Sequence, residues 1–331
     1  MSGQSTRAIV VNQTGGPEVL KWQEIELPAP AAGQVLIRHT AIGFNMVDTY
    51  VRKGLYPAEL PYTPGGEATG IIEDVADGVK GFAAGERIAY VTPPNVLGAY
   101  SERRVIDAKY IFKIADGISD DDIAASLLKG LTAWALLRKT YPVKAGENIL
   151  VYAAAGGVGS ILCQWAKHIG ARVIGIVGSE NKIESARLNG CAEVICRNTQ
   201  DIVKTVRELT NAKGVPVVYD SLGRETFETS LDCLQKRGLM VSYGNATGPV
   251  PPVNILSLMQ KGSLFLTRPR FFDYIDLPEE LEEAVAELFE LIRKGLIKIH
   301  IGERFPLADA ARAHAAAESA QTVGSTILLP G

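Results

Sequence analysis

The chain has 331 residues, with 34 Lys or Arg and 37 Asp or Glu, and a formal net charge of −3. It is too long for one typical core and fits two domains, and its hydrophobic content of 47% is enough to bury both. Acids and bases are interspersed, so composition points neither to a nucleic acid nor to a membrane surface as partner.

No signal peptide or membrane span is expected. The opening residues MSGQSTRAIVV contain no cleavable apolar core, and Lys129 interrupts the apolar stretch 123–137. The four cysteines are Cys163, Cys191, Cys196 and Cys233. None forms a C-x-x-C pair, which is typical of buried thiols in a reducing compartment. We therefore predict a cytoplasmic protein.

Residues 1–127 have the pattern of a β-rich, barrel-like unit. Short apolar or alternating runs such as GQVLIRHTAIGFN and GIIEDV are separated by turn signals such as TGGPE, YTPGGE and AAGER. This segment is predicted to form a compact β domain of its own.

Residues 128–268 alternate strands with helices. Six apolar runs, NILVYA, ARVIGIVG, AEVICR, VPVVYD, LMVSYG and SLFLTRP, are separated by amphipathic helices that often end in glycine. This alternation predicts an α/β domain with a doubly wound parallel sheet. Residues 269–331 add two helices and the strand STILLP; this tail is too small to fold alone, so we expect it to return to the first domain.

The segment AAAGGVGS, residues 153–160, lies at the first joint between strand and helix. It matches the dinucleotide fingerprint G-x-G-x-x-G with Ala154 in the first place. Gly156 allows close backbone approach to a pyrophosphate, Gly159 allows helix and strand to pack, and the helix from about Gly157 supplies N–H groups. A dinucleotide is therefore predicted, with an S-adenosyl donor as the main rival ligand.

The cofactor is selected at the end of the second strand, where an acidic residue would bind the ribose of NAD. Here GIVGSENK places Gly178 and Ser179, with Lys182 nearby. A hydroxyl and a lysine suit a 2′-phosphate, whereas a carboxylate would repel it. Glu180 can point to solvent as the residue that opens the next helix. NADPH is therefore favoured over NADH.

A catalytic zinc site is not expected. Such a site needs about three Cys, His or carboxylate ligands, but the first domain has no cysteine and only His39, in an alternating strand. Without metal, the chemistry reduces to hydride transfer to an electron-poor acceptor such as a quinone or an activated alkene.

Polar residues in GFNMVDTYVRKGLYP are candidates for holding this acceptor. Asn45, Asp48, Tyr50 and Tyr56 lie there, and tyrosines can flank a flat molecule and hydrogen-bond its oxygen. Packing of the barrel explains them equally well. Arg268 is a further candidate.

Several motifs together resemble one family. They are AAAGGVG, GFNMVDTY, YTPGGEATG, LLKGLTAW, YDSLG, YGNATG and GSLFLTRP. In this order, over nearly the whole chain, they are similar to the zinc-independent, zeta-crystallin-like quinone oxidoreductases of the medium-chain dehydrogenase/reductase superfamily. The resemblance implies a GroES-like catalytic domain made from both chain ends, a Rossmann domain, NADPH in the cleft between them and a homodimer formed through the Rossmann domains.

The resemblance also implies residue roles. Asn45 and Gly66 fall where zinc-dependent relatives carry zinc ligands. Asn45, Tyr50 and Tyr56 would face the substrate, with Asn45 also at the cofactor. The remaining residues implied along NADPH are Lys129, Thr132, Gly156, Gly157, Val158, Gly178, Ser179, Lys182, Ser221, Tyr243, Gly244 and Phe265.

The leading hypothesis is an NADPH:quinone reductase. One alternative is an enoyl or 2-alkenal reductase that uses the same hydride on a carbon–carbon double bond. Another is a non-catalytic NADPH-binding or RNA-binding protein, against which stands the lack of any segment that combines a basic groove with exposed aromatic residues.

Arg197 stands where relatives often carry a tyrosine near the adenosine. We hypothesise that it stacks on adenine and pairs with the 2′-phosphate, replacing a basic residue absent at Ala320 and Gln321. Arg197→Ala should then weaken NADPH binding much more than NADH binding in a titration of each nucleotide. Equal loss for both nucleotides would contradict this role.

Overall fold

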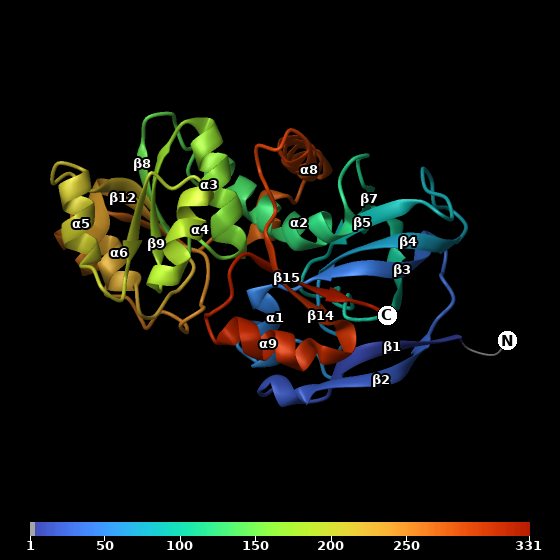
Figure 1. Cartoon of the computed structure of the whole chain (residues 1–331). Coiled ribbons are helices and arrows are strands. Elements are labelled where there is room, and N and C mark those ends of the chain that lie inside the picture. Colours follow the sequence, from blue (N-terminus) through green and yellow to red (C-terminus); the bar gives the residue numbers. More distant parts are fainter. Residues whose placement is uncertain (1–3) are drawn as a thin grey trace. The chain divides into compact units, whose positions relative to one another are not determined.

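The computed structural model describes residues 4–331, which form two compact units. Unit 1 contains the chain up to Leu128 and a second segment, Ile299–Gly331. Unit 2 contains Lys129–Lys298. The chain therefore enters unit 2 once and then returns to complete unit 1, as its colour gradient shows (Figure 1).

Unit 2 is built on a six-stranded parallel sheet in the order β10-β9-β8-β11-β12-β13. Counted from β8, the order is 3-2-1-4-5-6, which is that of doubly wound dinucleotide-binding sheets. It confirms the α/β class and the six strands predicted from the sequence. The strands are β8 (Asn148–Tyr152), β9 (Arg172–Val177), β10 (Glu193–Cys196), β11 (Val215–Asp220), β12 (Leu234–Ser242) and β13 (Phe265–Thr267).

Helices cover both faces of this sheet. Right-handed crossovers place α3 and α4 on one face and α5 and α6 on the other (Figure 1). All of β8 after Asn148 and all of β9 after Arg172 is buried, because a strand covered on both faces has no solvent side. The helices are α3 (Gly157–Ile169), α4 (Ile183–Leu188), α5 (Ile202–Leu209), α6 (Phe227–Cys233) and α7 (Leu256–Gln260).

The tail from residue 269 divides between the two units. α9 (Ala310–Glu318), β14 (Ile301–Pro306) and β15 (Ser325–Leu329) lie in unit 1, whereas α8 (Pro278–Arg293) lies in unit 2. The sequence assigned the whole tail to the first domain, but unit 2 extends to Lys298.

Packing against α2 (Asp120–Trp134) explains the position of α8. A Cβ on Gly130 would lie 2.5 Å from the side chain of Leu288, so the two helices meet where α2 lacks a side chain. Glu287 also accepts hydrogen bonds from the indole of Trp134 and from Arg138. These partners are specific to α8, and its amphipathic pattern alone does not reveal them.

Unit 1 contains a seven-stranded sheet in the order β14-β15-β3-β4-β5-β7, with β6 also paired to β3. Apart from the parallel pair β14 and β15, these strands are antiparallel. β1 and β2 form a separate two-stranded sheet. The strands from the first segment are β1 (Gln4–Val11), β2 (Leu20–Leu27), β3 (Gln34–Gly43), β4 (Glu67–Val75), β5 (Arg87–Val91), β6 (Arg103–Asp107) and β7 (Ile111–Lys113).

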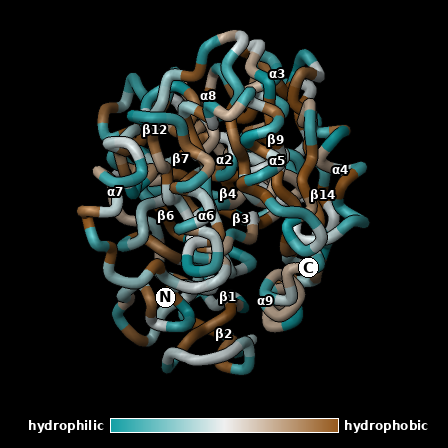
Figure 2. The backbone as a smooth tube through the Cα atoms, turned by 90° about the vertical axis from the view of Figure 1, so that its left-hand side faces the viewer, coloured by the Kyte–Doolittle hydropathy of each residue, from teal (hydrophilic) through white to brown (hydrophobic). Residues whose placement is uncertain are grey.

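Each unit has its own apolar core. Ile37, Ile72 and Tyr90 belong to the cluster in unit 1, and Ile174 and Val218 belong to the cluster in unit 2. Short apolar runs, brown in Figure 2, are separated along the backbone by hydrophilic turns. Within residues 4–331, every helix is too short or too polar to cross a bilayer.

A close approach between β3 and β4 leads the chain into α1 (Met46–Arg52). β3 ends at Gly43 and β4 begins at Glu67. A Cβ on Gly43 would lie 2.3 Å from Oε2 of Glu67 and 2.3 Å from the carbonyl oxygen of Ala124. Glycine at position 43 therefore leaves the room that the buried Glu67 carboxylate occupies.

Asp220 organises the loops at the carboxyl edge of the sheet in unit 2. Its fully buried carboxylate accepts hydrogen bonds from the backbone N–H groups of Leu222 and Gly223 at 2.7 and 3.1 Å. It also accepts from the hydroxyls of Thr226 and Ser230, each at 2.7 Å. One carboxylate thus fixes the loop after β11 and the start of α6.

Asp220→Ala should lower the free energy of unfolding by about 3 kcal/mol, because four donors lose a buried charged acceptor. Urea unfolding of the purified chain measures this change. Asp232→Ala is the matched control: this carboxylate is 44% exposed, pairs with Lys261 and should change stability by no more than about 1 kcal/mol. Equal effects of the two substitutions would contradict the assignment.

Candidate active site

The glycine segment forms a tight turn between β8 and α3. Ala153 adopts φ 51°, and Gly156 is the N-cap of α3 with φ −87°. A Cβ on Gly159 would lie 2.1 Å from the carbonyl oxygen of Ala153, so only glycine permits this contact between helix and strand. Ala154, in the first place of the fingerprint, is buried and carries its Cβ without a positive φ.

Gly156, Gly157 and Val158 therefore lie at the first positions of α3. A helix N-terminus presents backbone N–H groups and positive dipole to an anion. A Cβ built on Gly156 would lie 3.2 Å from the carbonyl oxygen of Ala153, a tight contact but a longer one than at Gly159. The turn can thus admit a phosphate against the backbone without any charged side chain.

Cationic side chains lie at the end of β9, where the sequence placed selection of the cofactor. A Cβ on Gly178 would be 3.7 Å from Nε of Arg197, and Nη1 of Arg197 pairs with Glu225 at 2.8 Å. Lys182 is half-buried, and burial lowers its pKa. Glu180 is exposed. This corner therefore combines glycine with two basic residues, one of which is paired with the Glu225 carboxylate.

The loops after β11 and β12 lie directly against each other. A Cβ on Gly244 would lie 2.2 Å from the carbonyl oxygen of Ser221, and the backbone N–H of Tyr243 donates to the backbone carbonyl oxygen of Asp220. Arg268 joins this group, because its Nη1 donates to the carbonyl oxygens of Ser242 and Gly244, each at 2.9 Å.

The structure separates Phe265 from these loop residues. Phe265 begins the edge strand β13 opposite Leu239, and its side chain is 61% exposed. Lys129 and Thr132 lie instead on neighbouring turns of α2, and the Lys129 side chain is buried. Of the predicted cofactor residues in unit 2, the glycine turn, Gly178, Ser221, Tyr243 and Gly244 share the carboxyl edge of the sheet.

In unit 1, Asn45 is the N-cap of α1 and is 8% exposed. Its backbone N–H donates to Oδ2 of Asp48 at 3.0 Å, and its side chain accepts the backbone N–H of Asp48, which completes a capping box. Its Nδ2 donates to Oε2 of Glu67 at 2.7 Å. The rings of Tyr50 and Tyr56 stand edge to face with centroids 5.6 Å apart. The structure therefore brings the candidate substrate residues to the two ends of one short helix.

Glu67 is a site residue that the sequence reasoning missed. It is fully buried, and its Oε1 accepts from the backbone N–H of Leu128 at 2.7 Å, while Oε2 accepts from Asn45. The available signal was a charged residue beside Gly66 at the start of the apolar run EATGII. A carboxylate at a buried strand position requires donors, and here one of them is the candidate Asn45.

His39, the histidine in the first segment of unit 1, is bound within the barrel. His39 is buried between the carbonyl oxygen of Ser101 and the hydroxyl of Tyr90, and burial lowers its pKa to about 4. A Cβ on Gly66 would lie 3.0 Å from the carbonyl oxygen of Thr92. In the described part of the chain, no three His, Cys, Asp or Glu side chains form a metal-binding group.

All four cysteines, in contrast, lie in unit 2, where they are free and buried. The Sγ atoms of Cys163 and Cys191 are 3.6 Å apart.

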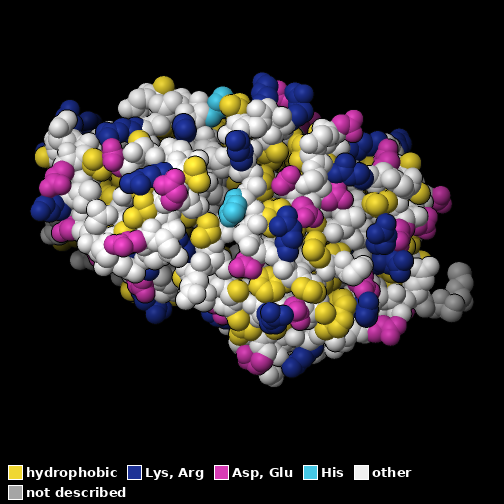
Figure 3. Space-filling model, viewed as in Figure 1, with side chains coloured by type: hydrophobic (Ala, Val, Ile, Leu, Met, Phe, Trp, Pro, Cys, Tyr) yellow, Lys and Arg dark blue, Asp and Glu magenta, His cyan; other side chains and the backbone are white. Residues whose placement is uncertain are grey.

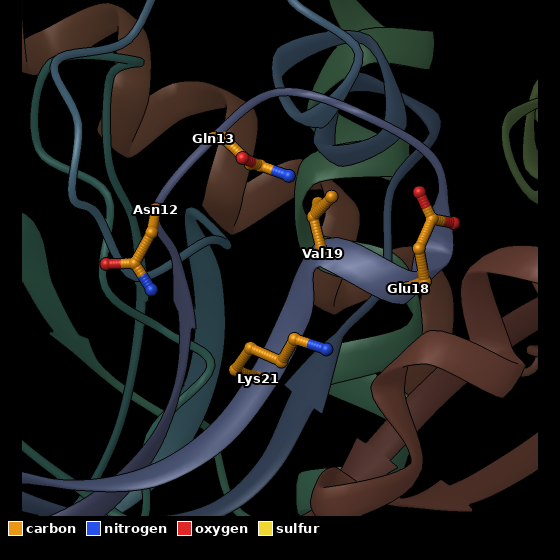
Figure 4. A pocket seen from close by; sticks show the side chains of 5 residues that line it. All are labelled: Asn12, Gln13, Glu18, Val19 and Lys21. Atoms are coloured by element: carbon orange, nitrogen blue, oxygen red, sulfur yellow. The ribbon is translucent and has the colours of Figure 1, made fainter.

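A surface pocket of about 210 Å³ lies elsewhere in unit 1, beside the β1–β2 hairpin (Figure 4). It is lined by Asn12, Gln13, Glu18, Val19 and Lys21. All of these except Val19 are exposed or half-buried, and none was predicted from the sequence to belong to the site.

Family models match both parts of the chain. Residues 31–116 match the "Alcohol dehydrogenase GroES-like domain", and residues 157–290 match "Zinc-binding dehydrogenase". A GroES-like barrel combined with this doubly wound nucleotide domain defines a medium-chain dehydrogenase/reductase.

Full-length relatives narrow the family. A quinone oxidoreductase of Pseudomonas aeruginosa is 50% identical over 96% of this chain and 97% of its own length. A 2-haloacrylate reductase of a Burkholderia species is 43% identical over 98% of both chains. The crystal structure of Escherichia coli quinone oxidoreductase complexed with NADPH has a TM-score of 0.95 and 49% identity, covering 98% of this chain and 100% of that chain. The chain belongs to the quinone oxidoreductase family, as its motifs predicted.

Two glycines of the turn should separate folding from binding. Gly159→Ala should destabilise the chain by about 2 kcal/mol, because its Cβ would overlap the Ala153 carbonyl. Gly156→Ala should lower the thermal unfolding midpoint less than Gly159→Ala, since its Cβ would lie 3.2 Å from the same oxygen, but it should weaken dinucleotide binding about tenfold because the methyl group keeps the phosphate from the backbone. Differential scanning fluorimetry and nucleotide titration measure the two effects; unchanged binding by Gly156→Ala would contradict the placement of the phosphate.

Proposed function

We propose that this protein is an NADPH:quinone oxidoreductase that transfers hydride without metal or flavin. The observation that carries the proposal is the match, over 98% of the chain, to the Escherichia coli quinone oxidoreductase complexed with NADPH. The net reaction is quinone plus NADPH plus a proton giving hydroquinone plus NADP⁺, in which bound nicotinamide supplies the hydride.

The residues at the edge of the sheet fit NADPH. The turn at Gly156 is the N-cap of α3, and the backbone N–H groups of a helix N-terminus suit the pyrophosphate. Gly178 lies beside the Arg197 guanidinium, and Lys182 follows within the same loop. A bound 2′-phosphate would replace the Glu225 carboxylate as the partner of Arg197. A planar guanidinium can bind such an anion through two hydrogen bonds.

The acceptor is proposed to lie against Asn45, Tyr50 and Tyr56. Tyr50 and Tyr56 offer aromatic surface to a flat ring, and the Asn45 amide is held by Glu67 rather than free to rotate. Zinc sites use thiolate, imidazole or carboxylate ligands. Asn45 has a neutral amide and Gly66 has no side chain, so these two residues support chemistry without zinc. The remaining proposed cofactor residues are Lys129, Thr132, Ser221, Tyr243 and Gly244.

Reduction of an activated alkene is the second candidate function. It is favoured by the 43% identity with a protein named 2-haloacrylate reductase over 98% of the chain. Both reactions need a hydride donor and an electron-poor acceptor, so they differ in the shape of the acceptor rather than in the cofactor.

RNA binding receives less support than either reaction. Figure 3 shows Lys and Arg interspersed with Asp and Glu over the face in view, without a continuous basic groove. Binding of single-stranded nucleic acid uses such a groove together with exposed aromatic residues.

The protein is also proposed to form a homodimer through unit 2. β13 is the edge strand of its sheet, and its residues Phe265 and Leu266 are 61% and 37% exposed. α7, which precedes β13, exposes Met259, and Ile255 is exposed at its N-cap. An unpaired apolar edge is suited to pairing with a second copy of the same strand.

Four free, buried cysteines support the proposed cytoplasmic location.

NADPH oxidation with a panel of quinones and a panel of 2-alkenals, each with and without a chelator, tests the proposed function. Quinones should be the faster substrates, and the chelator should leave kcat unchanged within about twofold, because no step uses a metal. Faster turnover of alkenals would favour the second function. Loss of turnover with the chelator would contradict the metal-free reaction.

A further inference from the structure

A buried series of hydrogen bonds connects α9 with Asn45. Nε2 of His314 lies 3.2 Å from the hydroxyl of Tyr100, which donates to Oδ2 of Asp48 at 3.0 Å. The same Oδ2 accepts the backbone N–H of Asn45 at 3.0 Å. All of these residues are buried, with His314 and Tyr100 fully enclosed.

Arg52 sets the direction of this series. Its guanidinium is fully buried and donates through Nε to the carbonyl oxygen of Gly15 at 3.1 Å. Nη1 lies 3.1 Å from Nδ1 of His314. A guanidinium can only donate, so Nδ1 must accept, and the imidazole proton must be on Nε2. His314 therefore donates to Tyr100, and the single hydroxyl proton of Tyr100 is directed to Asp48.

The surroundings keep His314 in this neutral form. Burial lowers its pKa to about 3, with a further contribution from the positive charges of Arg52 and Lys53. Burial also raises the pKa of Tyr100 well above its ordinary value, and Asp48 adds to the effect. The donor order therefore stays the same across neutral pH.

Asn45 is consequently held at two points by two buried carboxylates. Asp48 fixes its backbone N–H, and Glu67 fixes its side-chain NH₂ group. The remaining polar atom of the amide, Oδ1, accepts the backbone N–H of Asp48 in the capping box. A shift of Asp48 would move the N-cap of α1 and so redirect this oxygen.

We propose that His314, Tyr100 and Asp48 are positioning residues that aim Asn45 for hydride transfer. This inference rests on the proposed function, in which Asn45 contacts the cofactor and the acceptor. It gives the segment that returns to unit 1 a part in the reaction, since α9 contributes His314 although it lies 262 residues after Arg52. Small errors in the placement of a reacting group are costly to rate, whereas they change overall stability little.

Unit 1 contains a matched pair for comparison. Tyr90 and His39 are also buried, and their Oη and Nε2 atoms are 2.8 Å apart. Nδ1 of His39 contacts the carbonyl oxygen of Ser101 at 2.7 Å, so this pair ends on the backbone of the barrel. Both pairs join a buried tyrosine hydroxyl to an imidazole, but Tyr100 donates to the carboxylate that holds the Asn45 backbone, whereas Tyr90 also contacts Arg104.

Tyr100→Phe should lower kcat with NADPH and a quinone about tenfold, whereas Tyr90→Phe should keep kcat within about twofold of the wild type. Both substitutions should lower the thermal unfolding midpoint similarly, since each removes one buried tyrosine hydroxyl. In an Asn45→Ala background, Tyr100→Phe should have less than about a twofold further effect on kcat, because residues that act through one another are not additive.

Equal kcat for Tyr100→Phe and Tyr90→Phe, or independent multiplication of the Tyr100→Phe and Asn45→Ala effects, would overturn the inference. If Tyr100→Phe folds poorly, the other end of the series is tested. His314→Gln retains an acceptor for Arg52 and a donor for Tyr100 and should keep several-fold more kcat than His314→Leu. Equal kcat for those two variants would also overturn it. Absence of quinone turnover by the wild type would instead reject the proposed function, and the inference with it.

Discussion

Two buried carboxylates, Asp48 and Glu67, hold Asn45 at the start of α1, and the rest of unit 1 supplies what they need. A buried carboxylate is stable only when donors surround it. Glu67 takes the backbone N–H of Leu128, which ties β4 to α2, and fits only because residue 43 is glycine. The barrel therefore serves as a frame that desolvates these carboxylates and presents one amide.

Unit 2 also contains a buried carboxylate surrounded by donors, but there it fixes the shape of a loop. Asp220 gathers two backbone N–H groups and two hydroxyls, so the carboxylate shapes a loop rather than a side chain. Gly159 and Gly244 then allow backbones to meet where a Cβ would overlap a carbonyl oxygen. Binding surface at the carboxyl edge of the sheet is thus made mainly of main chain. Such a surface depends on close packing and cannot be assembled from isolated side chains.

Periodicity in the sequence predicted the parallel sheet and its six strands, because the signal for each strand is local. It also placed the glycine turn at the correct joint. The unit to which α8 belongs could not be predicted in this way. Its amphipathic pattern indicates that one face packs against a partner, but it does not identify Gly130 of α2 as the contact for Leu288. Glu67, Asp220 and His314 were missed or taken as structural for a related reason. Their roles come from donors and acceptors far away in the sequence, such as Arg52 for His314.

The two tyrosine–histidine pairs of unit 1 show that residue type and burial alone do not identify a positioning residue. His39 and His314 are both buried, neutral and bonded to a tyrosine hydroxyl. Burial explains their protonation state equally in both cases, so it does not distinguish a core residue from a positioning residue. The distinction lies in the group at the end of each series. The His39 pair ends at the backbone carbonyl oxygen of Ser101, whereas the His314 pair ends at the Asp48 carboxylate, which also accepts the backbone N–H of Asn45. A hydrogen-bonded histidine therefore acquires a role in the reaction through the group at the end of its series, and only the folded chain specifies that group.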